Sequence, residues 1–347
     1  MSKRMLLILL STLMVLALVM AACSGDEETE SEDISGQTVN ILTAAGEDQI
    51  AAFEASLAPF EERTGVDVVV EGSGDFETLA VVRAEADDPP DIYNFPQPGL
   101  MADFARDDFL IDLGQFLEDD YMKEQYNQTW IDLGTVDGTL YGVWHNADVK
   151  SLVWYPKDDF EAAGYEIPET WDELVALTDQ IVADGHTPWC IAIESSGATG
   201  WVGTDWVEDI MLRTAGGEKY DEWVAGDLPF DSPEVREAFR VMEEIWLNPD
   251  YVLGGTTGIL TTAFGDGPLP LFDEPPSCFL HRQASFILNF FPEGSVIGED
   301  VDYFYLPPID EANHGKPVLG SGSILSLGKD TPAGRATMEF LTTGEST

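Results

Sequence analysis

Positive charge is the feature that this sequence has least of. Its 347 residues include 16 Lys and Arg against 65 Asp and Glu, which gives a formal net charge of -49 at pH 7. Nucleic acid and anionic lipid surfaces would repel such a chain, so we expect no nucleic-acid partner. Three explanations of the acidity stay open: a surface solvated for high salt, steering of a cationic ligand, and lineage bias. We favour the first.

A long apolar run occurs only at the start of the chain. Lys3 and Arg4 precede sixteen residues, 5–20, without a charge. This run is too short for a comfortable membrane span and is typical of an export signal. Residues 20–23, Met-Ala-Ala-Cys, resemble a bacterial lipobox although Met20 stands where Leu is usual, which implies a signal peptide over residues 1–22 and lipid on Cys23. A plain secretory signal and an uncleaved anchor are the alternatives, and each places the function outside the cytoplasm.

Cysteine and histidine are also scarce, with three and four residues. Cys190 and Cys278 remain once Cys23 is assigned to the lipobox, and an oxidising compartment favours a disulfide between them. Two independent buried thiols are the alternative. So few soft ligands, scattered along the chain, argue against a metal site, and we expect no cofactor.

Local patterns predict an α/β protein. Residues 23–36 are polar and acidic and are expected to be a tether. Short apolar strands over residues 38–42, 66–70 and 91–95 then alternate with amphipathic helices, which favours a mostly parallel sheet covered by helices. Thr170 and Glu173 form the pattern of a capping box. A strand is predicted over residues 188–193, and Ser-Pro at 232–233 and Thr-Pro at 331–332 open further helices.

The order of these elements resembles the extracellular solute-binding proteins of ABC importers, the sugar-binding type related to maltose-binding protein. FEERTGV at 60–66 and IPETWDEL at 167–174 together are a fairly specific signature. The segments 198–216 and 275–286 further resemble an α-glucoside-binding lipoprotein subgroup.

This resemblance implies a periplasmic-binding-protein-like α/β fold, with two lobes that each hold a mostly parallel sheet flanked by helices and are joined by crossover hinge strands. We expect lobe one over residues 37–145, lobe two over 146–317, and a return to lobe one over 318–347. The resemblance also implies that the family's C-terminal part is missing here. The implied partners are a carbohydrate, which the protein captures by hinge closure, and the ABC permease subunits in the membrane. The resemblance also implies a monomeric protein, held at the membrane by the lipid on Cys23.

A sugar offers flat C–H faces to aromatic rings and hydroxyl edges to planar polar groups. Trp201, Asp205 and Trp206 combine both features directly after the predicted strand 188–193 and a Gly-rich turn. We expect ligand contact from Asp205 and from at least one Trp, with Trp201 the better candidate. The alternative is the start of a helix with a Trp in the core.

Other aromatic and polar residues follow strands or lie at the crossovers. Each has an ordinary structural alternative, such as capping or an internal ion pair. The further candidates for ligand binding are Glu47, Asp48, Phe95, Gln97, Trp144, Asn146, Arg282 and Ser321.

Three classes of function compete. A transport binding protein, which captures an oligosaccharide such as an α-glucoside and performs no catalysis, is our prediction. A surface glycoside hydrolase would need a positioned pair of carboxylates, and no acid here stands in such a context. A cell-surface sensor or adhesin subunit would share the fold and the ligand site.

Overall fold

The computed structural model describes residues 33–346, and within helix α2 it does not describe the side chains of Glu47 and Asp48. The predicted signal peptide and Cys23 lie outside the described residues. The chain divides into residues 1–35 and a compact unit over residues 36–347. Within the described part, no helix combines the length and the apolar character that a membrane span needs.

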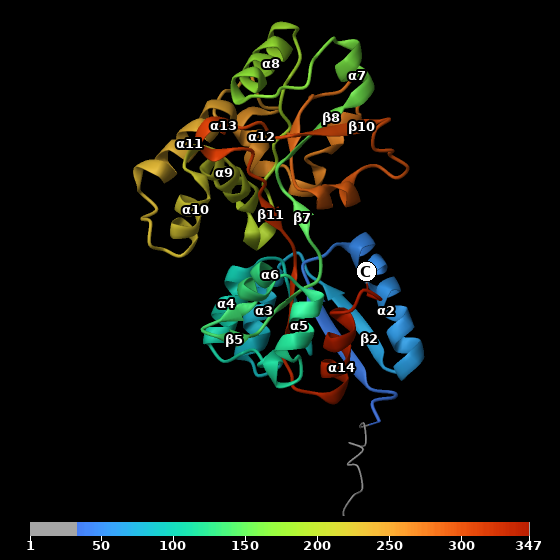
Figure 1. The fold of residues 1–347 in the computed structure, drawn as a ribbon. Helices are drawn as coiled ribbons and strands as arrows, with labels where there is room; N and C mark the ends of the chain where they lie inside the picture. The colour runs from blue at the N-terminus through green and yellow to red at the C-terminus, as the bar shows by residue number, and fades with distance from the viewer. Residues whose placement is uncertain (1–32, 347) are drawn as a thin grey trace, which may run out of the picture. The chain divides into compact units, whose positions relative to one another are not determined.

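Lobe one, as we call the part built on the larger sheet, contains a five-stranded sheet in the order β2-β1-β3-β12-β6 (Figure 1). Strands β2 and β3 pair with β1 in parallel, whereas β12 is antiparallel to both β3 and β6. The strands are β1 (Thr38–Thr43), β2 (Asp67–Gly72), β3 (Ile92–Phe95), β6 (Val143–Trp144) and β12 (Ile324–Leu327), with a separate pair formed by β4 (Thr135–Val136) and β5 (Thr139–Leu140). The helices are α2 (Glu47–Thr64), α3 (Phe76–Glu85), α4 (Pro98–Arg106), η1 (Leu113–Gln115), α5 (Asp119–Gln125), α6 (Gln128–Leu133) and α14 (Pro332–Leu341).

Strand β12 and helix α14 show how the chain returns to lobe one. Strand β12 is buried along its whole length because it lies between β3 and β6. Helix α14 follows at once, and the Thr331 side chain accepts a hydrogen bond from the backbone N–H of Gly334 at its start. The last strand and the last helix of the described residues thus belong to lobe one, where α14 contacts β1 and β12.

Lobe two contains a three-stranded sheet in the order β10-β8-β9. The strands are β8 (Leu152–Pro156), β9 (His281–Arg282) and β10 (Val301–Tyr305). The helices are α7 (Lys157–Ala162), α8 (Trp171–Ala183), η2 (Ser196–Ala198), α9 (Trp201–Thr214), α10 (Gly216–Val224), α11 (Pro233–Trp246), α12 (Gly255–Thr261), η3 (Phe264–Asp266), η4 (Leu269–Phe272), η5 (Ser285–Phe290) and α13 (Glu311–His314).

The structure corrects two expectations for lobe two. Its sheet is antiparallel throughout, not mostly parallel. The prediction of a strand over residues 188–193 is also wrong. This extended segment makes only single parallel bridges, from Trp189 to Val252 and Leu280. Isolated bridges do not build a ladder, and Pro188 has no N–H to donate to one.

Helix starts that were predicted from local signals are confirmed. Thr170 and Glu173 form the reciprocal capping box of α8. Ser232 accepts a hydrogen bond from the N–H of Val235 at the start of α11, and Pro233 occupies the first helical position. These signals act over three or four residues, so they need no knowledge of the tertiary fold.

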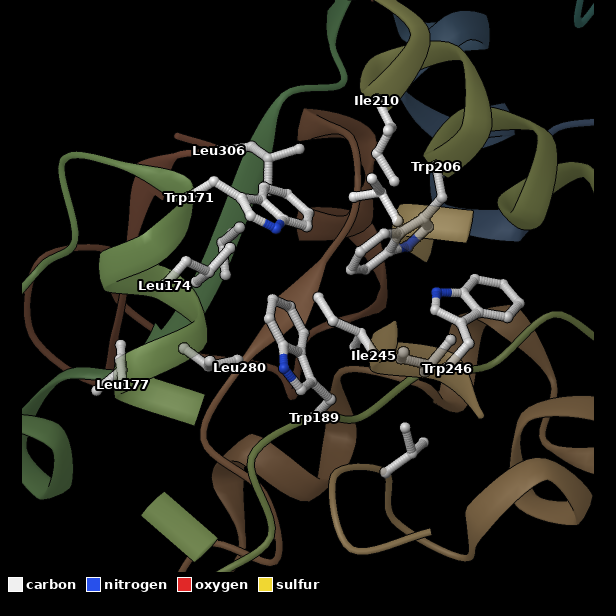
Figure 2. Close-up of a cluster of buried hydrophobic side chains, with 14 of the residues drawn as sticks. Trp171, Leu174, Leu177, Trp189, Trp206, Ile210, Ile245, Trp246, Leu280 and Leu306 are labelled. Carbon is white, nitrogen blue, oxygen red and sulfur yellow. The ribbon is translucent and has the colours of Figure 1, made fainter. Parts of the chain in front are cut away.

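Tryptophans dominate the core of lobe two. Trp171, Trp189, Trp206 and Trp246 converge with aliphatic side chains from α8, α9 and α11 (Figure 2). Trp206 packs edge-on against Trp189 at 5.4 Å and against Trp246 at 5.9 Å between ring centroids. Each buried indole removes on the order of 200 Å² from water, so this cluster fixes how α9 lies against α11.

Two short strands connect the lobes. Strand β7 (Asp148–Val149) pairs with β11 (Gly320–Ser321) in an antiparallel ribbon, which Figure 1 shows between the two lobes. The ribbon is extended by hydrogen bonds from the N–H of His145 to Ser323 O (2.9 Å) and from the N–H of Lys150 to Leu319 O (2.8 Å). We call residues 145–151 and 317–323 the hinge ribbon.

Candidate functional site

The start of helix α9 brings an aromatic ring to the side of lobe two that touches lobe one. Gly200 precedes the helix with a φ of 111°, a left-handed conformation that glycine adopts at little cost. Trp201 is the first helical residue and is partly exposed. Its ring centroid lies 5.3 Å from that of Phe264 and 5.8 Å from that of Phe286, so both rings pack against the indole.

A direct contact joins the two lobes beside this helix. The N–H of Gly197 in η2 donates a hydrogen bond of 3.3 Å to Asp75 Oδ1 at the start of α3. A Cβ atom at Gly197 would stand 3.4 Å from the same oxygen and 3.5 Å from Thr78 Oγ1. Sequence reasoning missed this contact, for which the small residues of the 195–200 turn were the only signal.

Asp205 and Arg282 belong to a buried network of ions rather than to an open surface. Asp205 is 4% exposed and accepts a hydrogen bond of 2.6 Å from Lys150 Nζ. Arg282 is 1% exposed and donates from Nη2 to Asp209 Oδ2 at 2.6 Å. Asp209 also pairs with Arg213 one helical turn later. Asp209, Arg213 and Lys150 were not predicted, although an acid and an Arg four residues apart on a helix are visible in the sequence.

Five of the predicted ligand-binding residues are largely buried in this structure. Phe95, Trp206 and Arg282 expose 0%, 0% and 1% of their surface, so they present no face to a ligand in this conformation. Trp144 is 7% exposed, packs 4.7 Å from Trp130 and donates its indole N–H to Trp130 O. Asp205 is engaged by Lys150, as described above. Their contact with a ligand stays a prediction.

Three other predicted residues are accessible, and two of them, Asn146 and Ser321, lie in the hinge ribbon. Gln97 is exposed, and its Oε1 accepts a hydrogen bond from Leu100 N as the N-cap of α4, which leaves the amide NH₂ available. Asn146 Oδ1 accepts from both N and Oγ of Ser323 (2.6 and 2.8 Å), inside the hinge ribbon. Ser321 is partly exposed in β11. The side chains of Glu47 and Asp48, at the start of α2, lie outside the described residues.

One carboxyl near the network has a strongly displaced pKa. Burial is the main cause that raises the pKa of Glu208 to about 7, with the Lys150 ammonium opposing it and the Asp205 carboxylate adding to it. Tyr220, on α10, has its pKa raised chiefly by burial and next by the charge of Glu208. Glu208 therefore changes charge near neutral pH.

The two cysteines of the described residues are both buried in lobe two. The structure joins Cys190 to Cys278 with their Cα atoms 5.7 Å apart. The Cys190 carbonyl also contacts His281 Nδ1 at 2.9 Å, beside Arg282. Burial lowers the pKa of His281 to about 4, so its ring is neutral at neutral pH. The bridge ties the segment before η2 to strand β9.

Comparison with known proteins places this geometry in a family. The model of the family described as bacterial extracellular solute-binding protein matches residues 44–346. The osmoprotective compounds-binding protein GgtB of Synechocystis sp. is 48% identical over 332 residues, which cover 96% of this chain and 78% of that protein. The alpha-glucosides-binding periplasmic protein AglE of Rhizobium meliloti is 46% identical over 329 residues, which cover 92% of this chain and 71% of that protein.

Solved structures share the fold at low sequence identity. A chitin oligosaccharide binding protein superposes with a TM-score of 0.72 at 19% identity, over 89% of this chain and 76% of that one. The maltose-bound protein MalE3 of T. maritima superposes with a TM-score of 0.69 at 21% identity, over 89% and 78%. The two lobes, the crossing strands and the family match over nearly the whole described chain lead to one conclusion: the protein belongs to the bacterial extracellular solute-binding proteins.

Proposed function

We propose that this chain is the substrate-binding component of an ABC importer, and that its ligand is a carbohydrate of the α-glucoside class or a related osmoprotective compound. The observation that carries the proposal is the 48% and 46% identity, over almost the whole chain, to one protein named for osmoprotective compounds and another named for alpha-glucosides. The protein would bind its ligand without turnover and act as a monomer.

The proposed ligand surface lies where α9 begins. Trp201 offers a partly exposed indole face, and two phenylalanines pack against its ring. Gln97, Asn146, Ser321 and one or both acids at the start of α2 would supply polar contacts. Sugars need this combination of a flat apolar face and planar hydrogen-bonding groups.

We further propose the boundaries of the two lobes and the location of the protein in the cell. Lobe one would comprise residues 37–145 and 318–347, and lobe two residues 146–317. Lipid on Cys23 would hold the protein at the outer face of the cell membrane, with residues 23–36 as the tether, and the permease would receive the ligand there.

Thermal unfolding tests the ligand class. The chain from Ser24, which contains the whole compact unit 36–347, is melted in high salt with maltose, trehalose, sucrose and, as an osmoprotectant that is not a sugar, glycine betaine. Binding to the native state raises the midpoint by mass action. We expect a rise with at least one α-glucoside and no hydrolysis product. A rise with glycine betaine alone would overturn the carbohydrate assignment, and released monosaccharide would overturn the absence of catalysis.

A pair of variants tests the site. Trp201→Ala should weaken sugar binding by roughly tenfold or more, because it removes the stacking face. Trp223→Ala is the matched control, since Trp223 is a partly buried tryptophan on α10 that packs against Tyr220 and Phe230 instead. Equal losses in the two variants would contradict a ligand contact at Trp201.

A further inference from the structure

The hinge ribbon enters lobe two at a buried cluster of charges. Ser151, at the end of its first strand, is fully buried and its Oγ donates to Asp209 Oδ1 at 2.8 Å. The same Oγ accepts a hydrogen bond of 2.9 Å from the N–H of Leu319 in the second strand. One hydroxyl therefore connects both strands of the ribbon to helix α9.

Asp209 is the centre of this cluster. Its carboxylate is fully buried and receives Ser151, the guanidinium of Arg213 and Nη2 of Arg282, the last at 2.6 Å. One acid between two guanidiniums satisfies both carboxylate oxygens. Hydrogen bonds of this charge-assisted kind are short and directional, so they fix position as well as contribute energy.

Arg213 extends the cluster to the returning strand. It is fully buried and donates from Nη2 to Leu306 O at 2.8 Å and to Pro317 O at 3.2 Å, and from Nε to Pro307 O at 3.0 Å. Tyr305 OH donates to the same Pro317 carbonyl at 2.7 Å. The start of the second ribbon strand is thereby held by α9 and by the sheet of lobe two.

The middle of helix α9 therefore contacts the hinge ribbon, and its first residue comes directly after the turn that contacts lobe one. Asp209 lies two turns after Trp201, and the turn that precedes Trp201 carries the hydrogen bond from Gly197 to Asp75 of lobe one. A buried ion cluster gives no large net stability compared with well-packed apolar residues, and its best-supported use is to specify a geometry.

We propose that Asp209 is a hinge-positioning residue: with Ser151, Arg213 and Arg282 it clamps the lobe-two end of both ribbon strands to α9, so that bending is confined to the part of the ribbon nearer lobe one. The clamp limits the relative orientations that the two lobes sample in the absence of ligand. Only the consequence for binding rests on the proposed ligand-binding function. A ligand that must bridge both lobes then binds without having to order a loose hinge.

The test compares lobe-to-lobe distances in variants of the chain from Ser24. Spin labels at two exposed positions, Glu62→Cys on α2 and Glu161→Cys on α7, report the distance distribution without any ligand. Ser151→Ala removes the shared hydroxyl and keeps every charge. Asp209→Asn keeps the size and removes the central charge. Thr178→Val is the matched control, because Thr178 is a fully buried hydroxyl in lobe two that accepts from Trp189 Nε1 at 3.2 Å, away from the ribbon.

We expect a narrow distribution in the wild type and in Thr178→Val, and a broader one in Ser151→Ala and Asp209→Asn. Where the wild type binds maltose, Ser151→Ala should bind it roughly threefold to tenfold more weakly, because binding must then order a loosened hinge. If Asp209→Asn does not fold, Ser151→Ala still decides the question. A distribution in Ser151→Ala as narrow as in the wild type would overturn the proposal. A broadened distribution in a protein that no sugar stabilises would support the clamp and reject the proposed ligand class.

Discussion

Glu208 illustrates how a single side chain can oppose folding near neutral pH. Its neighbours on α9, Asp205 and Asp209, hold the close ionic partners of the network, whereas no side-chain hydrogen bond or ion pair is found for Glu208 in the described part of the chain. Burial then favours its neutral form and raises its pKa from 4.5 to about 7.

Stability should therefore fall as pH rises through this range. Between about pH 4.5 and pH 7 the native state holds a proton that the unfolded state has lost, so the free energy of unfolding decreases with pH. Glu208→Gln should remove that slope and stabilise the protein at pH 8 by up to about 3 kcal/mol, the size that such a shift sets. Urea unfolding of both proteins at pH 5 and pH 8 measures this effect. A variant that gains as much at pH 5 as at pH 8 would contradict the assignment.

The burial of individual aromatic residues could not be predicted from the sequence. Phe95 and Trp206 stand beside polar residues in the sequence, as ligand-binding aromatics often do. Both are packed in a core, Phe95 against Phe76 and Phe104, and Trp206, as expected of the second tryptophan, against two other tryptophans. Which face of an element is covered depends on partners distant in the chain, and a local pattern carries no information about them.

Helix α8 offers a test at the scale of an element. The Thr170 side chain accepts the N–H of Glu173, and the Glu173 carboxylate accepts the N–H of Thr170 in return. Thr170→Ala should lower the free energy of unfolding by about 1 kcal/mol, the usual effect of losing an N-cap. Thr170→Ser keeps the hydroxyl and is the control. The shift is read from the midpoint of urea unfolding at unchanged slope. An Ala variant as stable as the Ser variant would show that this cap contributes nothing.

The disulfide is a second element-scale prediction. Cys190 and Cys278 are 88 residues apart in sequence, so their bond restricts a long loop in the unfolded chain. The double variant Cys190→Ser and Cys278→Ser should lose about 2 to 5 kcal/mol of stability. Wild type melted with and without reductant provides the parallel measurement, because reduction of the same bond should lower the midpoint in the same direction. An unchanged midpoint in both experiments would mean that the bond does not form in solution.

Elements were predictable from the sequence where their signals are local. The helix caps and the first three strands of lobe one follow from residue patterns of a few positions. The segment after Pro188 reads as a strand because it is apolar and extended, yet its backbone meets only isolated partners at Val252 and Leu280. The hinge ribbon could not be read from the sequence either, since two-residue strands have no periodicity, and its location came from the family resemblance.

The whole sequence has a net charge of -49, and within the described residues the acids are at least partly exposed at the surface apart from Asp91, Asp205 and Asp209. Like charges spread over one compact unit repel one another, and this repulsion is relieved when the chain unfolds and expands. Salt screens that repulsion over a Debye length of about 10 Å at 0.1 M and about 3 Å at 1 M. The folded state should therefore gain more from added salt than the unfolded state does.

We accordingly expect the unfolding midpoint to rise steeply between low salt and about 1 M, where screening is nearly complete. Sodium chloride and potassium chloride at equal ionic strength should act alike if screening is the cause, whereas specific ion binding would separate them. Buried pairs such as Arg282 with Asp209 lie out of reach of this screening, so Asp209→Asn should shift the curve without changing its dependence on salt. A midpoint that stays flat or falls with salt would show that the acidity is not an adaptation to screening, and would turn attention to attraction of a cationic ligand or to compositional bias instead.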